Sequence, residues 1–114
     1  VVVNAPMPNE VIAEIKSVVD IPVIATVVSD RSDIKGRIEA GTDIFNVSGA
    51  AETASIVRHI REQYPHAAII ATGGPTEESI LETIRAGANA ITITPPTTGE
   101  LFAGIMHDYR EKKL

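Results

Sequence analysis

The chain has 114 residues, of which 44% are hydrophobic and 22% are charged, a balance typical of a globular protein rather than a disordered one. Its formal net charge is −5 and no block of basic residues is present, which disfavours nucleic acid and anionic membrane surfaces as partners. The absence of cysteine excludes disulfides, a thiolate nucleophile and cysteine-ligated zinc, and it fits a cytoplasmic location.

Strand-like and helix-like segments alternate along the whole chain. Short apolar runs predict strands at 1–5, 21–29, 43–49, 67–74 and 89–96. Apolar residues at helical spacing predict helices at 8–20, 32–41, 50–65, 76–88 and 98–114. Each strand is followed by a helix and short loops, so the same unit recurs five times. Strict alternation of this kind predicts an α/β fold with a parallel sheet and right-handed crossovers.

Two architectures fit this pattern of parallel βα repeats. One is about the last five units of a TIM (β/α)8 barrel, and the alternative is an open five-stranded doubly wound sheet. Polar residues occur near the carboxyl ends of otherwise apolar strands, among them Asn4, Thr26, Asn46 and Thr72. A barrel needs such a polar layer at its active-site mouth, and we therefore favour the barrel. In both cases residues 1–114 are predicted to form a single α/β domain, which in the barrel reading is a fragment of a larger barrel.

The double glycine Gly73-Gly74 lies between a predicted strand and a predicted helix. Glycine lets backbone N–H groups approach a ligand, and the amino end of a helix favours an anion, so this turn is a candidate phosphate site. A tight turn with no ligand is an equally good interpretation of the same residues. Thr76 is a predicted helix cap, and Thr76 with Ser79 does not match the usual capping-box sequence. The following loop, "TPPTTGE", could supply a second set of N–H donors, although its two prolines supply none.

The order of motifs resembles the 2-keto-3-deoxy-6-phosphogluconate/4-hydroxy-2-oxoglutarate (KDPG/KHG) aldolase family over about residues 21–93. The motifs are a Pro-Val strand, a helix ending in Glu39-Ala40-Gly41, an Ala51-Glu52 segment and a turn at Thr72-Gly73-Gly74. The resemblance implies a (β/α)8 barrel whose Thr-Gly-Gly turn binds phosphate. It also implies a Schiff-base lysine, and that position falls on Asn46, which cannot form an imine with a keto acid. The resemblance therefore supports the scaffold, while the residues present do not support lyase activity.

The remaining candidate groups carry weaker signals. His59, His66 and His107 are scattered without metal-ligand spacing, so no metal site and no cofactor are predicted. Asp30 and Asp33 flank the loop after the second strand, where they could bind a divalent cation or cap the next helix. We expect the helix cap. The catalytic residues stay unknown, and whether the protein is an enzyme stays open.

The sequence thus leads to two main functional hypotheses and one alternative. The first is an aldolase-like barrel that binds a small phosphorylated or carboxylated sugar ligand through Thr26, Asn46, Ser48, Thr72, Gly73 and Gly74. The second is a non-catalytic phosphate-ligand sensor resembling the glycerol-operon antiterminator barrels. The alternative is a regulatory or partner-binding α/β module. If five units stand alone, barrel edge strands stay unpaired, so we expect a homo-oligomer that covers them. The chain opens directly on a strand, and we expect that the natural protein has preceding residues.

Overall fold

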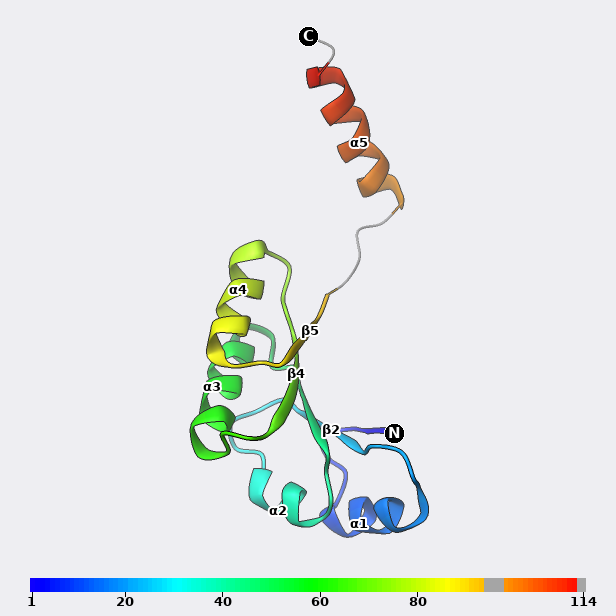
Figure 1. The fold of residues 1–114 in the computed structure, drawn as a ribbon, viewed down its shortest axis with the longest axis vertical. Helices are drawn as coiled ribbons and strands as arrows, with labels where there is room; N and C mark the ends of the chain where they lie inside the picture. Colours follow the sequence, from blue (N-terminus) through cyan, green and yellow to red (C-terminus); the bar gives the residue numbers. More distant parts are fainter. Residues whose placement is uncertain (94–97, 113–114) are drawn as a thin grey trace.

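The computed structural model describes residues 1–93 and 98–112. One sheet contains all the strands that it describes, in the order β1-β2-β3-β4-β5, and every neighbouring pair is parallel (Figure 1). The strands are β1 (Val2–Val3), β2 (Ile24–Val27), β3 (Ile44–Val47), β4 (Ala68–Thr72) and β5 (Ala90–Thr92). The predicted α/β class is confirmed. The five parallel βα units fit both predicted descriptions, the partial barrel and the open sheet.

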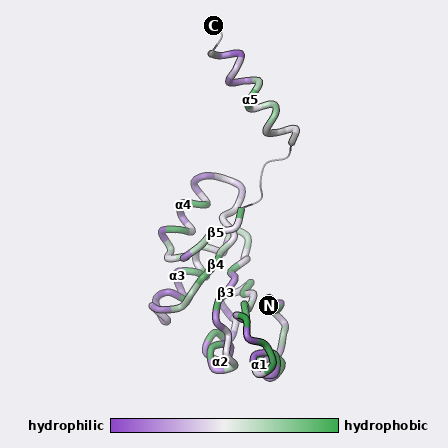
Figure 2. Tube along the Cα trace, turned by 45° about the vertical axis from the view of Figure 1, so that its right-hand side comes forward, coloured by the Kyte–Doolittle hydropathy of each residue, from purple (hydrophilic) through white to green (hydrophobic). Residues whose placement is uncertain are grey.

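A helix follows each strand. The helices are α1 (Asn9–Val18), α2 (Ile34–Glu39), α3 (Thr53–Gln63), α4 (Glu77–Ala86) and α5 (Thr98–Lys112), with a short 3-10 helix, η1 (Ala50–Glu52), before α3. Hydrophobic and hydrophilic residues alternate along α3 and α4 (Figure 2), as expected for helices with one buried side. Among the described helices, none has the combination of length and apolar character that crossing a membrane requires.

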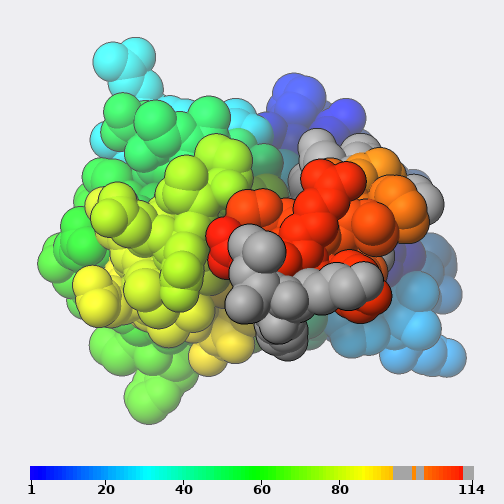
Figure 3. All heavy atoms as spheres, turned by 90° about the horizontal axis from the view of Figure 1, so that it is seen from above, coloured from blue at the N-terminus to red at the C-terminus, as the bar shows by residue number. Residues whose placement is uncertain are grey.

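The core lies between one face of the sheet and α1–α4. Alternate strand residues such as Ala25, Phe45 and Ile69 are buried there, and they pack against helix residues such as Ile12 and Ile56. Figure 1 shows α3 and α4 side by side on one side of β4. Because successive side chains alternate between faces, the other strand residues point away from these helices. Helix α5 stands away from the sheet (Figure 1), and the molecule extends 62 Å along its longest axis. In the view from above, the atoms of α5 lie in front of the rest of the chain (Figure 3).

We call the second side of the sheet the open face. None of α1–α4 covers it, and its strand residues are partly or largely exposed. The strand register places its residues in rows across the sheet. Its members are Val2, Ile24, Thr26, Ile44, Asn46, Ala68, Ile70, Thr72, Ala90 and Thr92. Their composition changes from mainly apolar at the amino end of the strands to mainly polar at the carboxyl end.

Arg61 of α3 holds the side of the sheet at which the strands begin. We call this side the amino edge, and the side at which the strands end the carboxyl edge. Its guanidinium donates hydrogen bonds of 2.7–3.1 Å to the carbonyls of Gly87, Pro65 and Ala67 and to Oδ1 of Asn89. These acceptors belong to the loops that enter β4 and β5, so one side chain fixes where both strands begin. All of these acceptors are neutral oxygens, which indicates a structural role for the charge of Arg61.

A second link at the same edge joins α1 to the strands. Lys16 Nζ lies 2.7 Å from Oδ2 of Asp43, and the same oxygen accepts the Val23 N–H at 2.8 Å. The hydrogen bond from Lys16, followed by that from Val23, holds the pKa of the Asp43 carboxyl below its usual range. This pair fastens the end of α1 to the start of β2 and β3.

Candidate functional site

The loop after β4 explains why two glycines stand together. A Cβ at Gly73 would lie 2.6 Å from Cγ2 of Ile91 and 2.8 Å from Cγ1 of Ile80, so close packing excludes a side chain there. Gly74 has a φ of +77°, in the left-handed region that favours glycine. The Gly73 N–H donates to the Thr92 carbonyl at 2.9 Å and extends the β4–β5 ladder by one residue. The tight-turn interpretation therefore accounts for both glycines without a ligand.

The helix that follows begins with a capping box, which corrects our expectation from the sequence. The Thr76 hydroxyl accepts the Ser79 N–H at 3.1 Å, and the Ser79 hydroxyl accepts the Thr76 N–H at 3.1 Å. The Ser79 hydroxyl also lies 2.8 Å from the Gly73 carbonyl, to which it can donate. The prediction was wrong because serine does here what glutamate or glutamine usually does in this motif. The two residues fix the glycine turn to the amino end of α4.

A cavity of about 640 Å³ opens beside this turn, a volume within the range of small-molecule sites. Its described lining residues are Thr72, Gly74, Pro75, Ile80, Thr92 and Ile93. Gly74 also borders a second hollow of about 450 Å³ on the side toward η1, which Ala50, Thr83 and Glu82 help to line. The turn thus separates two concave surfaces at the carboxyl edge of the sheet.

Several backbone donors around this turn are not used by the described part of the chain. Gly74 N–H has no acceptor among the described residues. The N–H groups of Glu77 and Glu78 lie in the first turn of α4, where no intrahelical acceptor exists. The helix dipole adds a partial positive charge at this end. These groups can bind an oxygen-bearing ligand.

Nearby side chains set the charge that such a ligand can carry. Glu77 and Glu78 lie in the first turn of α4, and Glu82 lines the second hollow. No lysine or arginine is among the described residues that line either hollow. The surroundings are therefore neutral to acidic, which disfavours a doubly charged phosphate more than a carboxylate or a hydroxyl group.

The six residues predicted to bind ligand are not all brought together. Thr72, Gly73 and Gly74 line the two hollows. Thr26 and Asn46 are neighbours in the β2–β3 register on the open face, and Ser48 follows β3. None of these last three is among the described lining residues of the two hollows. Their roles in binding stay predictions. The loop "TPPTTGE" lies largely outside the described residues.

Sequence reasoning missed two features of this edge. Thr92 faces the cavity because β5 pairs with β4 and aligns Thr92 with Thr72. Ala50 has a φ of 53°, an uncommon backbone conformation for a residue with a side chain, and it borders the second hollow. The alternating Thr-x-Thr pattern of the last strand could have identified Thr92 as a site residue. Nothing in the sequence predicts the positive φ of Ala50.

Neither Lys16 nor Lys35 is among the described residues that line the cavity, and the chain has Asn46 where the aldolase resemblance implies a lysine. Lys16 is paired with Asp43 at the opposite edge, and Lys35 is exposed on α2. No lysine lines the cavity within the described residues, so no amine is in place for a Schiff base.

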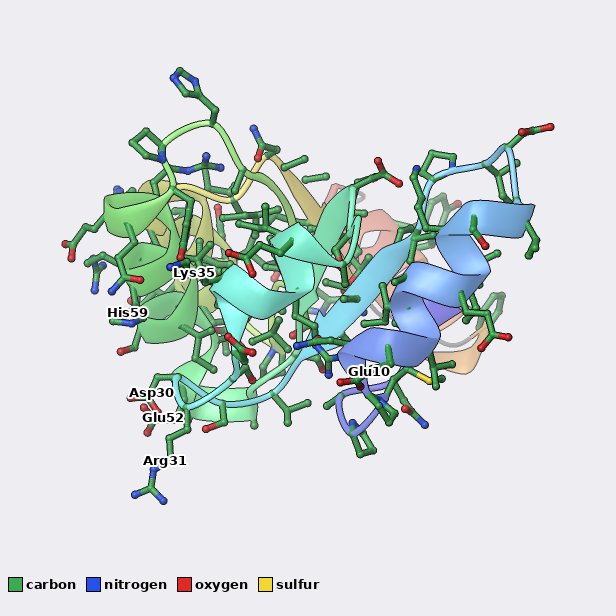
Figure 4. The ribbon with its side chains drawn as sticks, turned by 90° about the horizontal axis from the view of Figure 1, so that it is seen from below. Glu10, Asp30, Arg31, Lys35, Glu52 and His59 are labelled. Atoms are coloured by element: carbon green, nitrogen blue, oxygen red, sulfur yellow. The ribbon has the colours of Figure 1, made fainter. Side chains whose placement is uncertain are left out.

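The carboxylates after β2 form no metal centre in the described part of the chain. Asp33 caps α2, since its Oδ1 accepts the Gly36 N–H at 2.9 Å, as the capping interpretation expected. Asp30 lies beside Glu52 across a small hollow of about 170 Å³, while Arg31 points outward (Figure 4). Within the described residues, no group of three carboxylate or histidine side chains could hold a metal ion.

Comparison with protein-family models finds no match, and comparison with curated proteins finds no detectable relative. The resemblance to the KDPG/KHG aldolases therefore stays a prediction. Functional inference for this chain depends on the geometry of its carboxyl edge.

Proposed function

We propose that the chain binds a small hydroxylated carboxylic acid, of the sugar-acid or keto-acid type, in the cavity at the carboxyl ends of β4 and β5. The ligand binds without a covalent bond to the protein. The observation that carries the proposal is the wall of this cavity of about 640 Å³, which combines Thr72, Gly74 and Thr92. The N–H of Gly74, which has no acceptor among the described residues, and the amino end of α4 lie at the same turn.

Each part of the ligand has a matching group. The carboxylate accepts hydrogen bonds from the N–H of Gly74 and from the first turn of α4, where the dipole favours one negative charge. The ligand hydroxyls exchange hydrogen bonds with Thr72 and Thr92. Ile80 and Ile93 supply apolar wall for the carbon chain. This arrangement gives affinity and orientation, which is what a sensor of a metabolite requires.

The chemistry of the site favours binding over turnover. Class I aldol cleavage requires a lysine amine, and Asn46 occupies the place that the aldolase resemblance assigns to it. A carboxylate is favoured over a phosphate because Glu77 and Glu78 compete with a doubly charged group for the same positive field.

Calorimetric titration with gluconate, 6-phosphogluconate and pyruvate tests this proposal. Thr72→Val and Thr92→Val each remove one hydroxyl at nearly constant volume, and we expect each to weaken gluconate binding about 5- to 10-fold. Thr42→Val is the matched control, since Thr42 lies at the amino edge and its loss leaves affinity unchanged. Equal losses in all three variants, or no binding of any acid, would contradict the proposal.

Borohydride reduction in the presence of pyruvate separates binding from chemistry. We expect no covalent adduct on any lysine. An adduct would show that a Schiff base forms and would overturn the non-covalent reading.

A further inference from the structure

Helix α5 departs from the packing pattern of the units before it. Helix α3 packs against β3 and β4, and α4 packs against β4, β5 and α3. Each of these helices thus lies over its own strand and the next one, and α4 lies beside the helix before it. Helix α5 follows β5 but stands away from the sheet (Figure 1). It does not occupy the place beside α4 that this pattern assigns to it.

Helix α5 has one apolar side, and that side is exposed. Phe102, Ile105 and Met106 recur at helical spacing and therefore share one side of the helix. The first two are 63% and 57% exposed. His107 and Glu111 lie on the opposite side, where Nε2 of the histidine is 3.2 Å from Oε1 of the glutamate. An amphipathic helix of a globular protein buries its apolar side against another element. The composition of α5 is therefore that of a packed helix.

Helix α4 carries an apolar side that matches it. Ser79 and Glu82 border the hollow that α4 shares with Ala54 of α3, so they mark the side of α4 that faces α3. Leu81 and Ile84 lie on the other side of α4, and they are 41% and 48% exposed. This other side is where the next helix of the pattern belongs.

The two exposed apolar pairs occupy equivalent positions in their helices. Leu81 and Ile84 come four and seven residues after the first residue of α4, and Phe102 and Ile105 come four and seven residues after the first residue of α5. Helices of successive parallel units run in the same direction. Alignment of the two helix starts therefore places Leu81 level with Phe102 and Ile84 level with Ile105.

We propose that α5 docks on its own chain, with Phe102 and Ile105 against Leu81 and Ile84 of α4, and so completes the fifth βα unit. Because α5 then lies on the side of the sheet that holds α4, the open face stays uncovered by it. Thr72 and Thr92 belong to the open face, so their hydroxyl groups stay available to a ligand.

The connection between β5 and α5 is long enough for this arrangement. The five Cα–Cα steps from residue 93 to residue 98 can span at most about 18 Å. Adjacent helices pack with their axes about 8–10 Å apart. Loops of about two to six residues are usual between a strand and the helix that packs beside it. A helix that begins at Thr98 can therefore start level with α4 and beside it.

The dimensions of the chain show how much a docked α5 would change. A compact chain of 114 residues has a radius of gyration of about 13 Å, whereas the value with α5 extended is 17.8 Å. A compact protein of 12.1 kDa exposes about 6000 Å², whereas this chain exposes 7727 Å². Docking of α5 lowers both quantities, and the radius of gyration can be measured in solution.

Small-angle X-ray scattering of the full chain, with the mass of each sample fixed by light scattering, tests the proposal. Phe102→Asp places a charge on the apolar side of α5, and we expect it to raise the radius of gyration toward 17.8 Å. Gly104→Asp is the matched control, because it adds the same charge on the opposite side of α5, where a Cβ meets nothing within 4 Å. This variant should keep the wild-type radius. Equal radii for wild type and Phe102→Asp at equal mass would overturn the proposal.

A designed cysteine pair identifies the surface on which α5 docks, since the chain contains no cysteine of its own. Ile84→Cys combined with Ile105→Cys places two thiols at level positions, and facing residues of packed helices come within about 7 Å between Cα atoms. We expect a disulfide within one chain on mild oxidation. Lys35→Cys combined with Ile105→Cys is the control and should stay reduced, because Lys35 is exposed on α2.

Two results of the cysteine experiment would overturn the proposal. A disulfide that forms only between two chains would show that α5 docks on a second copy. No disulfide in the Ile84→Cys, Ile105→Cys protein would show that α5 does not pack on this side of α4. The inference does not depend on the proposed ligand, since both experiments are done in the absence of any acid.

Discussion

The amino edge and the carboxyl edge of the sheet, where the strands begin and end, differ in how their polar groups are used. At the amino edge, Arg61 makes hydrogen bonds with four different residues, and Asp43 is bonded to both Lys16 and Val23. At the carboxyl edge of β4 and β5, the Gly74 N–H has no acceptor in the described chain, and Thr72 and Thr92 border a cavity. At the amino edge these side chains are hydrogen-bonded within the fold, whereas at the carboxyl edge a backbone N–H group has no acceptor in the described chain. In parallel α/β folds, stability and ligand binding often divide in this way.

Thr42 is an exception at the amino edge. Its Oγ1 is buried and has no hydrogen-bond partner in the described chain. It borders a hollow of about 430 Å³ lined by Ile38, Phe45, Tyr64 and Pro65 among others. The lining of this hollow is largely apolar.

Removal of Arg61 should have the largest effect on stability. Arg61→Ala leaves several carbonyls and Asn89 Oδ1 without their donor, and we expect a loss of about 2–3 kcal/mol in the free energy of unfolding. Arg58→Ala is the matched control, because Arg58 lies exposed on the same helix. Urea unfolding followed by circular dichroism measures both. Equal losses in the two variants would show that Arg61 does not organise the amino edge.

Gly87→Ala tests the same edge at the end of α4. Gly87 has a φ of +114°, and a Cβ would lie 2.9 Å from Cγ of Arg61. We expect a loss of about 1–2 kcal/mol from backbone strain and displacement of Arg61. Gly104→Ala in α5 is the control, since a Cβ there meets nothing within 4 Å, and helix propensity should favour alanine. A neutral Gly87→Ala in thermal unfolding would mean that this turn is not constrained.

Ser79→Ala acts at the carboxyl edge, where we expect a smaller loss of about 1 kcal/mol. The substitution removes one half of the capping box and the hydrogen bond to the Gly73 carbonyl. Ser55→Ala on the exposed side of α3 should leave stability unchanged or slightly higher. Thermal melting of both variants checks the difference. A Ser79→Ala protein as stable as the wild type would contradict the role of the cap.

The effect of pH on Asp43 should be the smallest, because both Asp43 and Lys16 are well exposed. The folded-state pKa of Asp43 is lowered, so its stabilisation is fully present above the unfolded-state pKa, near about pH 4, and is lost as the pH falls through the folded-state pKa. Asp43→Asn keeps an acceptor for Val23 but removes the charge. The difference in unfolding free energy between wild type and Asp43→Asn should therefore shrink in acid. A difference that stays constant with pH would contradict the ion pair.

The alternation of strands and helices could be predicted because buried apolar residues recur at every second position in a strand and about every 3.6 positions in a helix. Boundaries depended on local contacts that the pattern does not contain. Helix α2 begins at Ile34 rather than near residue 32 because Asp33 caps it, and the helix predicted from residue 50 begins as a 3-10 turn beside the left-handed Ala50.

Part of the lining of the cavity could be predicted from the sequence. Thr72, Gly73 and Gly74 are local in the chain, so a turn motif could identify them. Thr92 joins them only through the β4–β5 register, which one sequence does not specify. Thr26 and Asn46 were predicted to bind ligand. The β2–β3 register aligns them on one face of the sheet, but a shared face does not by itself make a cavity.

The most direct test of the difference between the two edges is the map of backbone amide shifts in NMR spectra during titration with gluconate. We predict that the amides of Gly74, Glu77 and Glu78 shift with one common dissociation constant, while the amides of Gly87 and Asn89 at the amino edge stay in place. Shifts centred on the amino edge, or a saturated titration that leaves Gly74 unmoved, would contradict the assignment of ligand binding to the carboxyl ends of β4 and β5.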